Sequence, residues 1–251
     1  MREGARVALL IAVRHRPAMT IQGRVEGATL RSMANRNEGF VTIHKTTIYL
    51  LRHGDVRQDA IKRYIGQADL ALSVAGRHQA LKWADQLAQV PFTRIFCSDL
   101  TRAHETAAII AEGRSIPIHP LQKLREINLG AWDGQPIQEV RALYAEEYEK
   151  RGTDLIYYRP PAGECFADVA ARVIPLFEEI VRNASGDLLM VGHAGVNKVI
   201  LCHLLGMPLE NLLRLGQDYG CLNLIEYCRD AISVRGLNIR SQDHLPGELA
   251  P

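Results

Sequence analysis

Residues Thr46-Thr47-Ile48-Tyr49-Leu50-Leu51-Arg52-His53-Gly54 form an apolar run that ends in an arginine, a histidine and a glycine. A run of this length and β-branched content predicts a buried strand. Ligand sites of open α/β sheets form at the carboxyl ends of the strands. The stretch therefore predicts both a fold class and the place where the chemistry should lie.

Two further stretches repeat this pattern of a short apolar run followed by a helix. Residues 93–97 read TRIFC and precede a helix expected to begin near Thr101, with Ser98 or Asp99 as its cap. Residues 187–191 read DLLMV and precede a helix that should extend to position 205. The other expected elements are helices over 75–90, 136–150 and 163–182, a short strand over 116–118, and a hairpin of 222–227 with 231–234.

Strands that alternate with helices predict an α/β fold, here a three-layer sandwich with a mainly parallel central sheet. The first part of the chain, residues 1–46, carries eight Lys or Arg and three acids without a sustained period. We expect it to be a basic, poorly ordered N-terminal extension. Residues 47–240 form the expected domain, and residues 241–251 form an expected frayed tail.

Composition excludes several classes of protein. With 47% hydrophobic residues, 23% charged residues and a net charge of +2, the chain lacks the charge excess of a nucleic-acid-binding protein. Its longest early apolar run, residues 7–13, is too short to span a bilayer. The five cysteines are scattered without a C-x-x-C pair, which argues against zinc and disulfides and favours a cytoplasmic location. A homodimer is compatible with these features.

Four basic side chains fall at the ends of the predicted strands. Arg52 and His53 follow the first strand, Arg102 lies in the first turn after the second, and His193 follows the third. A parallel sheet brings these ends together, and paired guanidinium donors match the oxygens of a phosphate. The N-termini of the following helices, including one expected directly after Gly54, should add dipoles of the right sign.

This set of residues predicts phosphoryl transfer without a metal or other cofactor. The arginines and a protonated histidine supply the charge stabilisation that a metal ion gives elsewhere. A neutral imidazole is a nucleophile toward phosphorus, and the charge of Arg52 should lower the proton affinity of His53. A carboxyl group must then protonate the leaving alkoxide.

The Leu51-Arg52-His53-Gly54 sequence resembles the signature of the histidine phosphatase superfamily. Five further stretches resemble motifs of that family in the same order, so the resemblance covers roughly residues 47 to 231. These stretches are residues 63–76, 98–107, 124–134, 161–172 and 191–195. The resemblance implies a phosphoglycerate-mutase-like fold and a histidine phosphatase domain at 47–240.

The resemblance also implies roles for individual residues. His53 becomes the nucleophile, and Glu126 becomes the proton donor and later the base, although Asp133 is an alternative acid. Phosphate is held by Arg52, Arg102 and His193. The expected substrate-binding residues, in addition to those three, are Gly54, Gly66, Gln67 and Ala194.

One departure from the family pattern concerns the residues after Gly54. Asp55 and Asp59 stand where the family usually has Glu or Gln and a phosphate-holding Asn. A carboxylate at Asp59 would repel a phosphate dianion unless it is protonated or turned away. This departure keeps a second hypothesis open, a catalytically silent phosphate-binding or regulatory module.

The short segment between Glu126 and His193 favours the phosphatase branch of the family over the mutase branch. Residues 206–211 and 217–223 resemble those of α-ribazole phosphatases, which implies α-ribazole 5′-phosphate, a cobalamin precursor, as the substrate. The alternatives are a broad-specificity phosphatase, a sugar-phosphate phosphatase and, last, a phosphoglycerate mutase. Each of these readings has a small-molecule phosphate ester as the partner.

Overall fold

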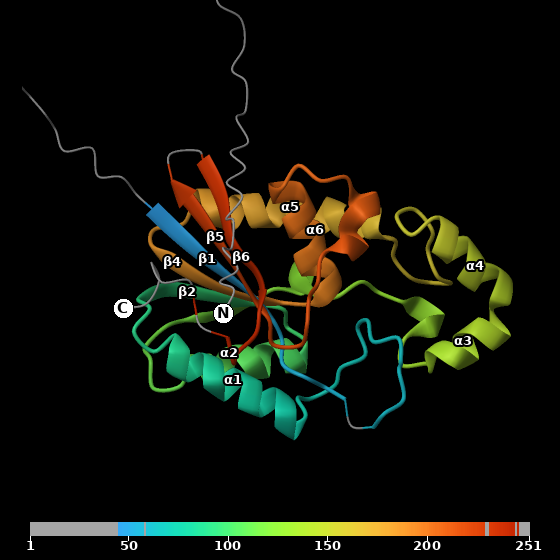
Figure 1. Cartoon of the computed structure of the whole chain (residues 1–251), viewed down its shortest axis with the longest axis horizontal. Coiled ribbons are helices and arrows are strands. Elements are labelled where there is room, and N and C mark those ends of the chain that lie inside the picture. Colours follow the sequence, from blue (N-terminus) through green and yellow to red (C-terminus); the bar gives the residue numbers. More distant parts are fainter. Residues whose placement is uncertain (1–44, 58, 229–230, 244, 246–251) are drawn as a thin grey trace, which may run out of the picture.

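Six strands form one sheet in the order β3-β2-β4-β1-β5-β6 (Figure 1). The computed structural model describes residues 45–57, 59–228, 231–243 and 245. The strands are β1 (Lys45–Arg52), β2 (Phe92–Cys97), β3 (Ile118–Pro120), β4 (Asp187–Gly192), β5 (Leu222–Cys228) and β6 (Ala231–Ile239). The α-helices are α1 (Val74–Gln86), α2 (Thr101–Ala111), α3 (Ile137–Leu143), α4 (Ala145–Thr153), α5 (Phe166–Arg182) and α6 (Ala194–Leu204).

The sheet is mainly parallel. Strand β1 pairs in parallel with β4, and β2 pairs in parallel with both β4 and β3. The predicted hairpin of β5 and β6 is confirmed, and it extends the sheet with two antiparallel pairings, β1 with β5 and β5 with β6.

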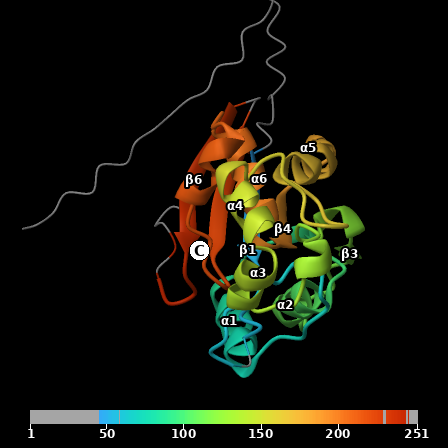
Figure 2. The same cartoon turned by 90° about the vertical axis from the view of Figure 1, so that its right-hand side faces the viewer.

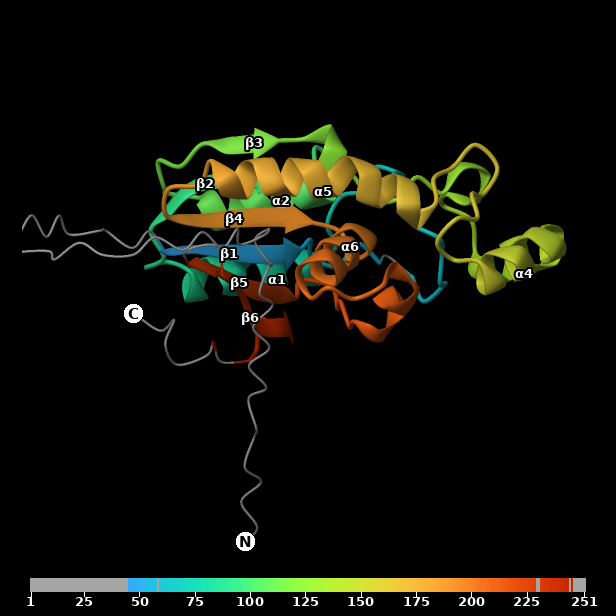
Figure 3. The same ribbon diagram turned by 90° about the horizontal axis from the view of Figure 1, so that it is seen from above.

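Alternate residues of β1 face two different cores, as the pleat of a strand requires. Ile48 and Leu50 join a cluster that includes buried residues of α5 and α6. Tyr49 and Leu51 join a second cluster with buried residues of α1 and α2. The two helical layers lie on opposite faces of the sheet (Figure 3), which confirms the predicted three-layer sandwich. Helices α3 and α4 project beyond the end of the sheet (Figure 1).

Three local predictions were wrong. The helix expected over 136–150 is two helices, because the backbone at Tyr144 leaves the helical region with φ of −125° and ψ of 46°. Leu100, rather than Ser98 or Asp99, precedes α2. A distant carboxylate caps that helix instead, because Asp69 accepts hydrogen bonds from the Thr101 backbone N–H over 2.7 Å and from its hydroxyl over 2.8 Å.

The third wrong prediction is the helix expected directly after Gly54. The next helix, α1, begins only at Val74, so the intervening chain forms a long loop over the end of the sheet. Gly54 and Gly76 meet where this loop returns. A Cβ atom on Gly54 would lie 2.5 Å from the Gly76 carbonyl oxygen, and one on Gly76 would lie 2.1 Å from the Asp55 carbonyl oxygen. Only glycine allows this contact, which fixes the backbone directly after His53.

The two ends of the described chain can be compared with the predicted boundaries of the domain. Lys45 and Thr46 belong to β1, and the rest of the predicted extension lies outside the described residues. Gln86 donates a 2.7 Å hydrogen bond to the carbonyl of Ser241, and Leu245 packs against the core beside α1 and α2. The described chain is therefore packed past the expected start of the tail. Among the described residues, no helix has the length and apolar character needed to cross a membrane.

Candidate active site

The carboxyl ends of β1 and β4 bring the two predicted histidines together. The parallel register pairs Arg52 with Gly192, so His53 and His193 follow at the same edge of the sheet. Their ring centroids are 5.0 Å apart. Arg102, in the first turn of α2, donates from Nε to Nε2 of His53 over 3.2 Å. Figure 2 views the molecule from the side on which these strands end.

The surroundings of His53 favour one form of its ring. Nδ1 lies 2.7 Å from the carbonyl oxygen of Gly54, which can only accept, so Nδ1 carries the proton. Nε2 therefore keeps its lone pair. Burial, followed by the positive charges of Arg52 and Arg102, lowers the pKa of His53 well below its usual value. The imidazole is thus neutral near neutral pH, the form that a nucleophile needs.

His193 is fully buried, yet neither of its ring nitrogens has a hydrogen-bond partner among the described residues. A buried polar atom without a partner costs about 1–3 kcal/mol. Burial lowers the pKa of His193 most, and the electrostatic interactions with the His53 ring and with Arg102 lower it further. An oxyanion beside His53 would offer these nitrogens a partner and would favour the protonated ring.

Arg102 is 1% exposed, and its guanidinium is held on two sides by backbone carbonyls. Nη1 donates to the carbonyl of Ala68 over 2.7 Å, and Nη2 donates to the carbonyl of Gly66 over 2.5 Å. Burial lowers the pKa of Arg102, whereas the carboxylates of Glu126 and Asp133 raise it. The long loop after β1 therefore positions the cation that contacts His53.

Two contacts hold the guanidinium of Arg52 in place. Nη1 donates to the carbonyl of Gln217 over 2.6 Å, and the guanidinium lies over the ring of Tyr219, 3.7 Å from its centroid. The Tyr219 ring is also 5.6 Å from the ring of His53. Nε of Arg52 is buried and has no partner among the described residues.

Glu126 is 8% exposed and lies at the N-terminus of α6. Oε2 accepts from the Gly195 N–H over 3.0 Å, and Oε1 accepts from the Ile127 N–H over 2.9 Å. A Cβ atom on Gly195 would come within 2.5 Å of Oε1, so glycine is needed there to admit the carboxyl group. Gln67 donates to the backbone carbonyl of Glu126 over 3.0 Å.

The structure therefore brings together five predicted residues: His53, His193, Arg52, Arg102 and Glu126. Gly54 directly follows His53 in the chain, and Ala194 directly follows His193. Gly66 and Gln67 contact Arg102 and Glu126. Their predicted roles in binding substrate remain a proposal.

Asp133, the alternative acid, is committed to a different task. Its two oxygens accept backbone N–H bonds from Gly66, Gln67 and Ala68 over 2.7–2.8 Å. The carboxylate thereby fixes the loop whose carbonyls hold Arg102. Glu126, which accepts from the N–H of Gly195, two residues after His193, is the better placed proton donor.

An Asp133→Ala variant should lose about 2–3 kcal/mol of unfolding free energy, because three backbone N–H groups lose their acceptor. Its kcat/KM should also fall, because the carbonyls that orient Arg102 are released. Urea unfolding and steady-state kinetics measure the two effects. Asp59→Ala is the matched control, since Asp59 is half-exposed and pairs with Arg63 at 3.3 Å. Equal stabilities of the two variants would contradict the proposed role of Asp133.

The two buried histidines also make a prediction about acid stability. Both have a folded-state pKa below the usual 6.5. The unfolded chain therefore binds more protons below that pH, and folding stability falls as the pH falls. Each histidine should contribute about 1.4 kcal/mol for each pH unit until its folded-state pKa is reached. Urea unfolding between about pH 7 and pH 5 measures the slope. An unchanged slope in a His53→Gln/His193→Gln variant would contradict this explanation.

The two aspartates that depart from the family pattern do not face the histidines unpaired. Asp55 forms a two-pronged ion pair with Arg57, at 3.0 Å from Nε and 2.5 Å from Nη2. Burial raises the pKa of Asp55, but the hydrogen bonds and charge of Arg57 together outweigh it and keep this pKa below its usual value. Asp59 pairs with Arg63. A phosphate could bind near Asp59 if its carboxylate were protonated or turned away. The ion pair with Arg63 favours the second condition.

Sequence reasoning missed several residues that support the site. Gln217 and Tyr219 hold Arg52, and Asn223 joins Gln217 in a buried amide network, with hydrogen bonds of 2.7 and 3.0 Å. The charges of Arg52 and Glu126 both act on Lys198, whose pKa is lowered chiefly by burial. Of these residues, only Gln217, Tyr219 and Asn223 could have been found from the sequence, because they belong to the stretch 217–223 that resembles the family. Among the described residues, no group of three or more His, Cys, Asp or Glu is arranged to hold a metal ion.

Comparisons with known proteins agree with this geometry. The chain is 32% identical over 197 residues to an adenosylcobalamin/alpha-ribazole phosphatase of Salmonella typhimurium, covering 77% of this chain and 96% of that protein. It is 35% identical over 177 residues to a glucosyl-3-phosphoglycerate phosphatase of Mycolicibacterium vanbaalenii, covering 67% and 78%. The solved alpha-ribazole phosphatase of Shigella flexneri superposes with a TM-score of 0.74 at 28% identity, covering 80% of this chain and all of that one.

The family model of the histidine phosphatase superfamily (branch 1) matches residues 48–240. This range begins inside β1 and ends just after β6, so it includes every strand and helix that positions the five predicted residues. The predicted family and its phosphoglycerate-mutase-like fold are therefore confirmed: the chain is a hydrolase that belongs to the histidine phosphatase superfamily.

Proposed function

We propose that the protein hydrolyses a small-molecule phosphate monoester through a phosphohistidine formed on His53. The observation that carries the proposal is the neutral His53 ring, whose Nε2 lone pair points at Arg102. Its neighbour His193 has two buried nitrogens that find no hydrogen-bond partner in the described part of the chain. A phosphate placed between the two rings would receive hydrogen bonds from His193 and Arg102. It would also present its phosphorus atom to Nε2.

In the first step, the lone pair of His53 Nε2 attacks phosphorus and forms a P–N bond while the P–O bond to the leaving group breaks. The hydrogen bond from Arg102 Nε–H to His53 Nε2 must first break, because it occupies the lone pair in the free protein; Arg102 keeps its proton and donates instead to a phosphate oxygen. Glu126 gives a proton to the leaving alkoxide. The Gly54 carbonyl accepts from Nδ1–H and so stabilises the positive charge that develops on the ring.

In the second step, Glu126, now a carboxylate, takes a proton from a water molecule. The water oxygen attacks phosphorus, the P–N bond breaks, and the electron pair returns to Nε2 of His53. Inorganic phosphate leaves, and Glu126 has regained its proton. The backbone N–H groups of Ile127 and Gly195 orient the carboxyl group in both steps, so one residue serves as acid and then as base.

For the natural substrate, we propose α-ribazole 5′-phosphate. The support is the similarity to relatives named for that activity, which extends over 96% of the Salmonella protein and all of the Shigella structure. Of the two stretches that carried the resemblance in the sequence, 206–211 and 217–223, the second lies next to the site through Gln217 and Tyr219.

A substrate panel tests this assignment. The wild-type protein should hydrolyse α-ribazole 5′-phosphate with a kcat/KM at least about a hundredfold above that for p-nitrophenyl phosphate, because the alcohol part of the true substrate adds binding energy in the transition state. Equal values for all esters would instead indicate a broad-specificity phosphatase. Isomerisation of 3-phosphoglycerate without phosphate release would indicate a mutase.

Glucosyl-3-phosphoglycerate is the second candidate substrate. It is favoured by the 35% identity to the Mycolicibacterium phosphatase, a higher value than that for the Salmonella relative over a shorter stretch. The same panel separates the two, because the preferred ester should exceed the other in kcat/KM by the same large margin. Negligible turnover of every ester, equal to that of His53→Ala, would favour the silent module.

A further inference from the structure

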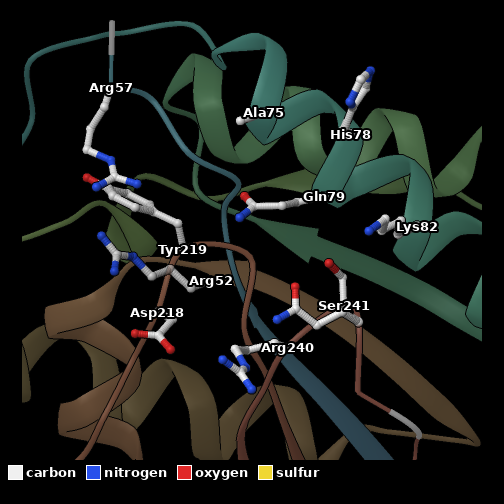
Figure 4. Close-up of a pocket in the computed structure, with 11 residues that line it drawn as sticks. Arg52, Arg57, Ala75, His78, Gln79, Lys82, Asp218, Tyr219, Arg240 and Ser241 are labelled. Carbon is white, nitrogen blue, oxygen red and sulfur yellow. The ribbon is translucent and has the colours of Figure 1, made fainter. Parts of the chain in front are cut away.

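A cavity of about 490 Å³ lies between α1 and the segment that follows β6 (Figure 4). Its walls include Ala75, His78, Gln79 and Lys82 of α1, Asp218 and Tyr219 of the loop before β5, and Arg240, Ser241 and Gln242. Arg52 and Arg57 complete the lining. Of the predicted site residues, Arg52 lines this cavity, whereas His53, Arg102, Glu126 and His193 do not, so the cavity adjoins the site described above and shares Arg52 with it.

The lining of this cavity is strongly cationic. Among the lining residues that the structure describes, four side chains carry a fixed positive charge and Asp218 is the one carboxylate. Arg57 pairs with Asp55 and Arg240 pairs with Asp243, both outside the lining. Lys82, in contrast, has no ion-pair partner among the described residues, and Nε of Arg52 is buried without a hydrogen-bond partner there.

The volume and the lining of the cavity indicate which class of ligand it can bind. Its volume falls in the range of about 300–1,000 Å³ that is usual for small-molecule sites, and it exceeds what one phosphate group fills. Figure 4 shows the Tyr219 ring between the side chains of Arg52 and Arg57, so its faces are already covered by guanidinium groups. The positively charged side chains along the cavity, from Arg57 to Lys82 and Arg240, are therefore the main groups available to bind a ligand.

We propose that this cavity binds a small polyanion, a molecule that carries at least two phosphate or carboxylate groups. One anionic group would contact Arg52 and Arg57, and a second would contact Lys82 and Arg240. The inference goes beyond the proposed function, because it concerns a second anion-binding region that adjoins the catalytic site at Arg52. The ligand is either a separate effector or the distal anionic end of a substrate, and the chemistry is the same for both.

The cavity communicates with the catalytic residues through Arg52. This side chain lines the cavity, lies over Tyr219 and lowers the pKa of His53 by its positive charge. An anion bound on the cavity side would offset part of that charge. It should therefore weaken phosphate binding beside His53 and raise the KM for a monophosphate ester.

Methylenediphosphonate, which has two anionic groups joined by a P–C–P link that a phosphatase does not cleave, is the probe. Calorimetric titration of the wild-type protein and of a Lys82→Gln/Arg240→Gln variant measures its affinity. The variant should bind at least about tenfold more weakly, because two charge-assisted hydrogen bonds are lost. The matched control is Arg94→Gln/Arg182→Gln, which removes two exposed charges that do not line the cavity and should bind like the wild type.

Kinetics in the presence of the probe separate the two sources of ligand. A separate effector gives partial inhibition of p-nitrophenyl phosphate hydrolysis that saturates, since both ligands bind at once. A distal substrate end gives complete competition. Either pattern must disappear in the Lys82→Gln/Arg240→Gln variant, which should keep its activity without the probe. Absence of binding, or equal affinity in this variant and the wild type, would overturn the proposal, whereas inactivity of the wild type toward phosphate esters would bear only on the proposed function.

Discussion

A His53→Ala variant is expected to lose at least about four orders of magnitude in kcat with every phosphate ester, because the loss of a nucleophile removes the covalent route itself. The phosphate-binding groups Arg52, Arg102 and His193 remain in this variant. Vanadate or phosphate binding should therefore survive. The fold should also survive, because Ile48, Leu50 and Leu51, the apolar residues that anchor β1, are unchanged.

Two measurements check this prediction. The first is kcat for the variant and for His104→Ala, the matched control, since His104 is an exposed histidine on α2 outside the predicted site residues. The second is rapid mixing of the wild type with ³²P-labelled ester, followed by quenching at alkaline pH, where phosphohistidine survives. Label on the wild type and on His104→Ala, with none on His53→Ala, is the expected result. Label retained by His53→Ala would assign the nucleophile elsewhere.

A Glu126→Gln variant should show the second largest effect. The amide keeps the size of the side chain but can neither give a proton to the leaving group nor take one from water, and general acid–base catalysis is worth about 10²–10⁴-fold. The loss in kcat/KM should be large for an alkyl phosphate, whose alkoxide needs the proton. It should be much smaller for p-nitrophenyl phosphate, whose leaving group is stable without one.

The comparison of leaving groups distinguishes an acid from a structural residue. kcat/KM reports the steps up to departure of the alcohol, so later hydrolysis of the phosphoenzyme does not obscure it. Asp133→Asn serves as the control for the alternative acid, and its losses for the two esters should be equal because its carboxylate orients the backbone of residues 66–68. Equal losses for both esters in Glu126→Gln would remove Glu126 from the role of acid.

Much of the fold could be predicted because the relevant signals are local. Strands β1, β2 and β4 end at Arg52, Cys97 and Gly192, each within one residue of the end of the predicted apolar run. The carboxyl ends of parallel strands lie at the same edge of a sheet, so a parallel sheet by itself predicts that the two histidines lie close together. The split between α3 and α4 was missed because a single residue, Tyr144, interrupts an otherwise helical pattern.

What could not be predicted depends on pairs of residues that are distant in sequence. The cap of α2 is Asp69, 32 positions before Thr101, because the loop after β1 crosses the start of that helix. Tyr219 covers Arg52 because the chain returns beside β1 just before β5. Neither contact follows from residue spacing, since each exists only after the loops have packed.

The sequence by itself determined which side chains lie at the strand ends, because a strand's length and hydrophobic pattern place its last residue. It thereby determined the family, the parallel sheet and the convergence of His53 with His193. Only the tertiary structure decided the state of these groups: the proton on Nδ1 of His53, the carbonyl clamp on Arg102 and the cationic cavity beside Arg52. Protonation and orientation depend on burial and on partners from distant loops, and these are properties of the folded chain as a whole.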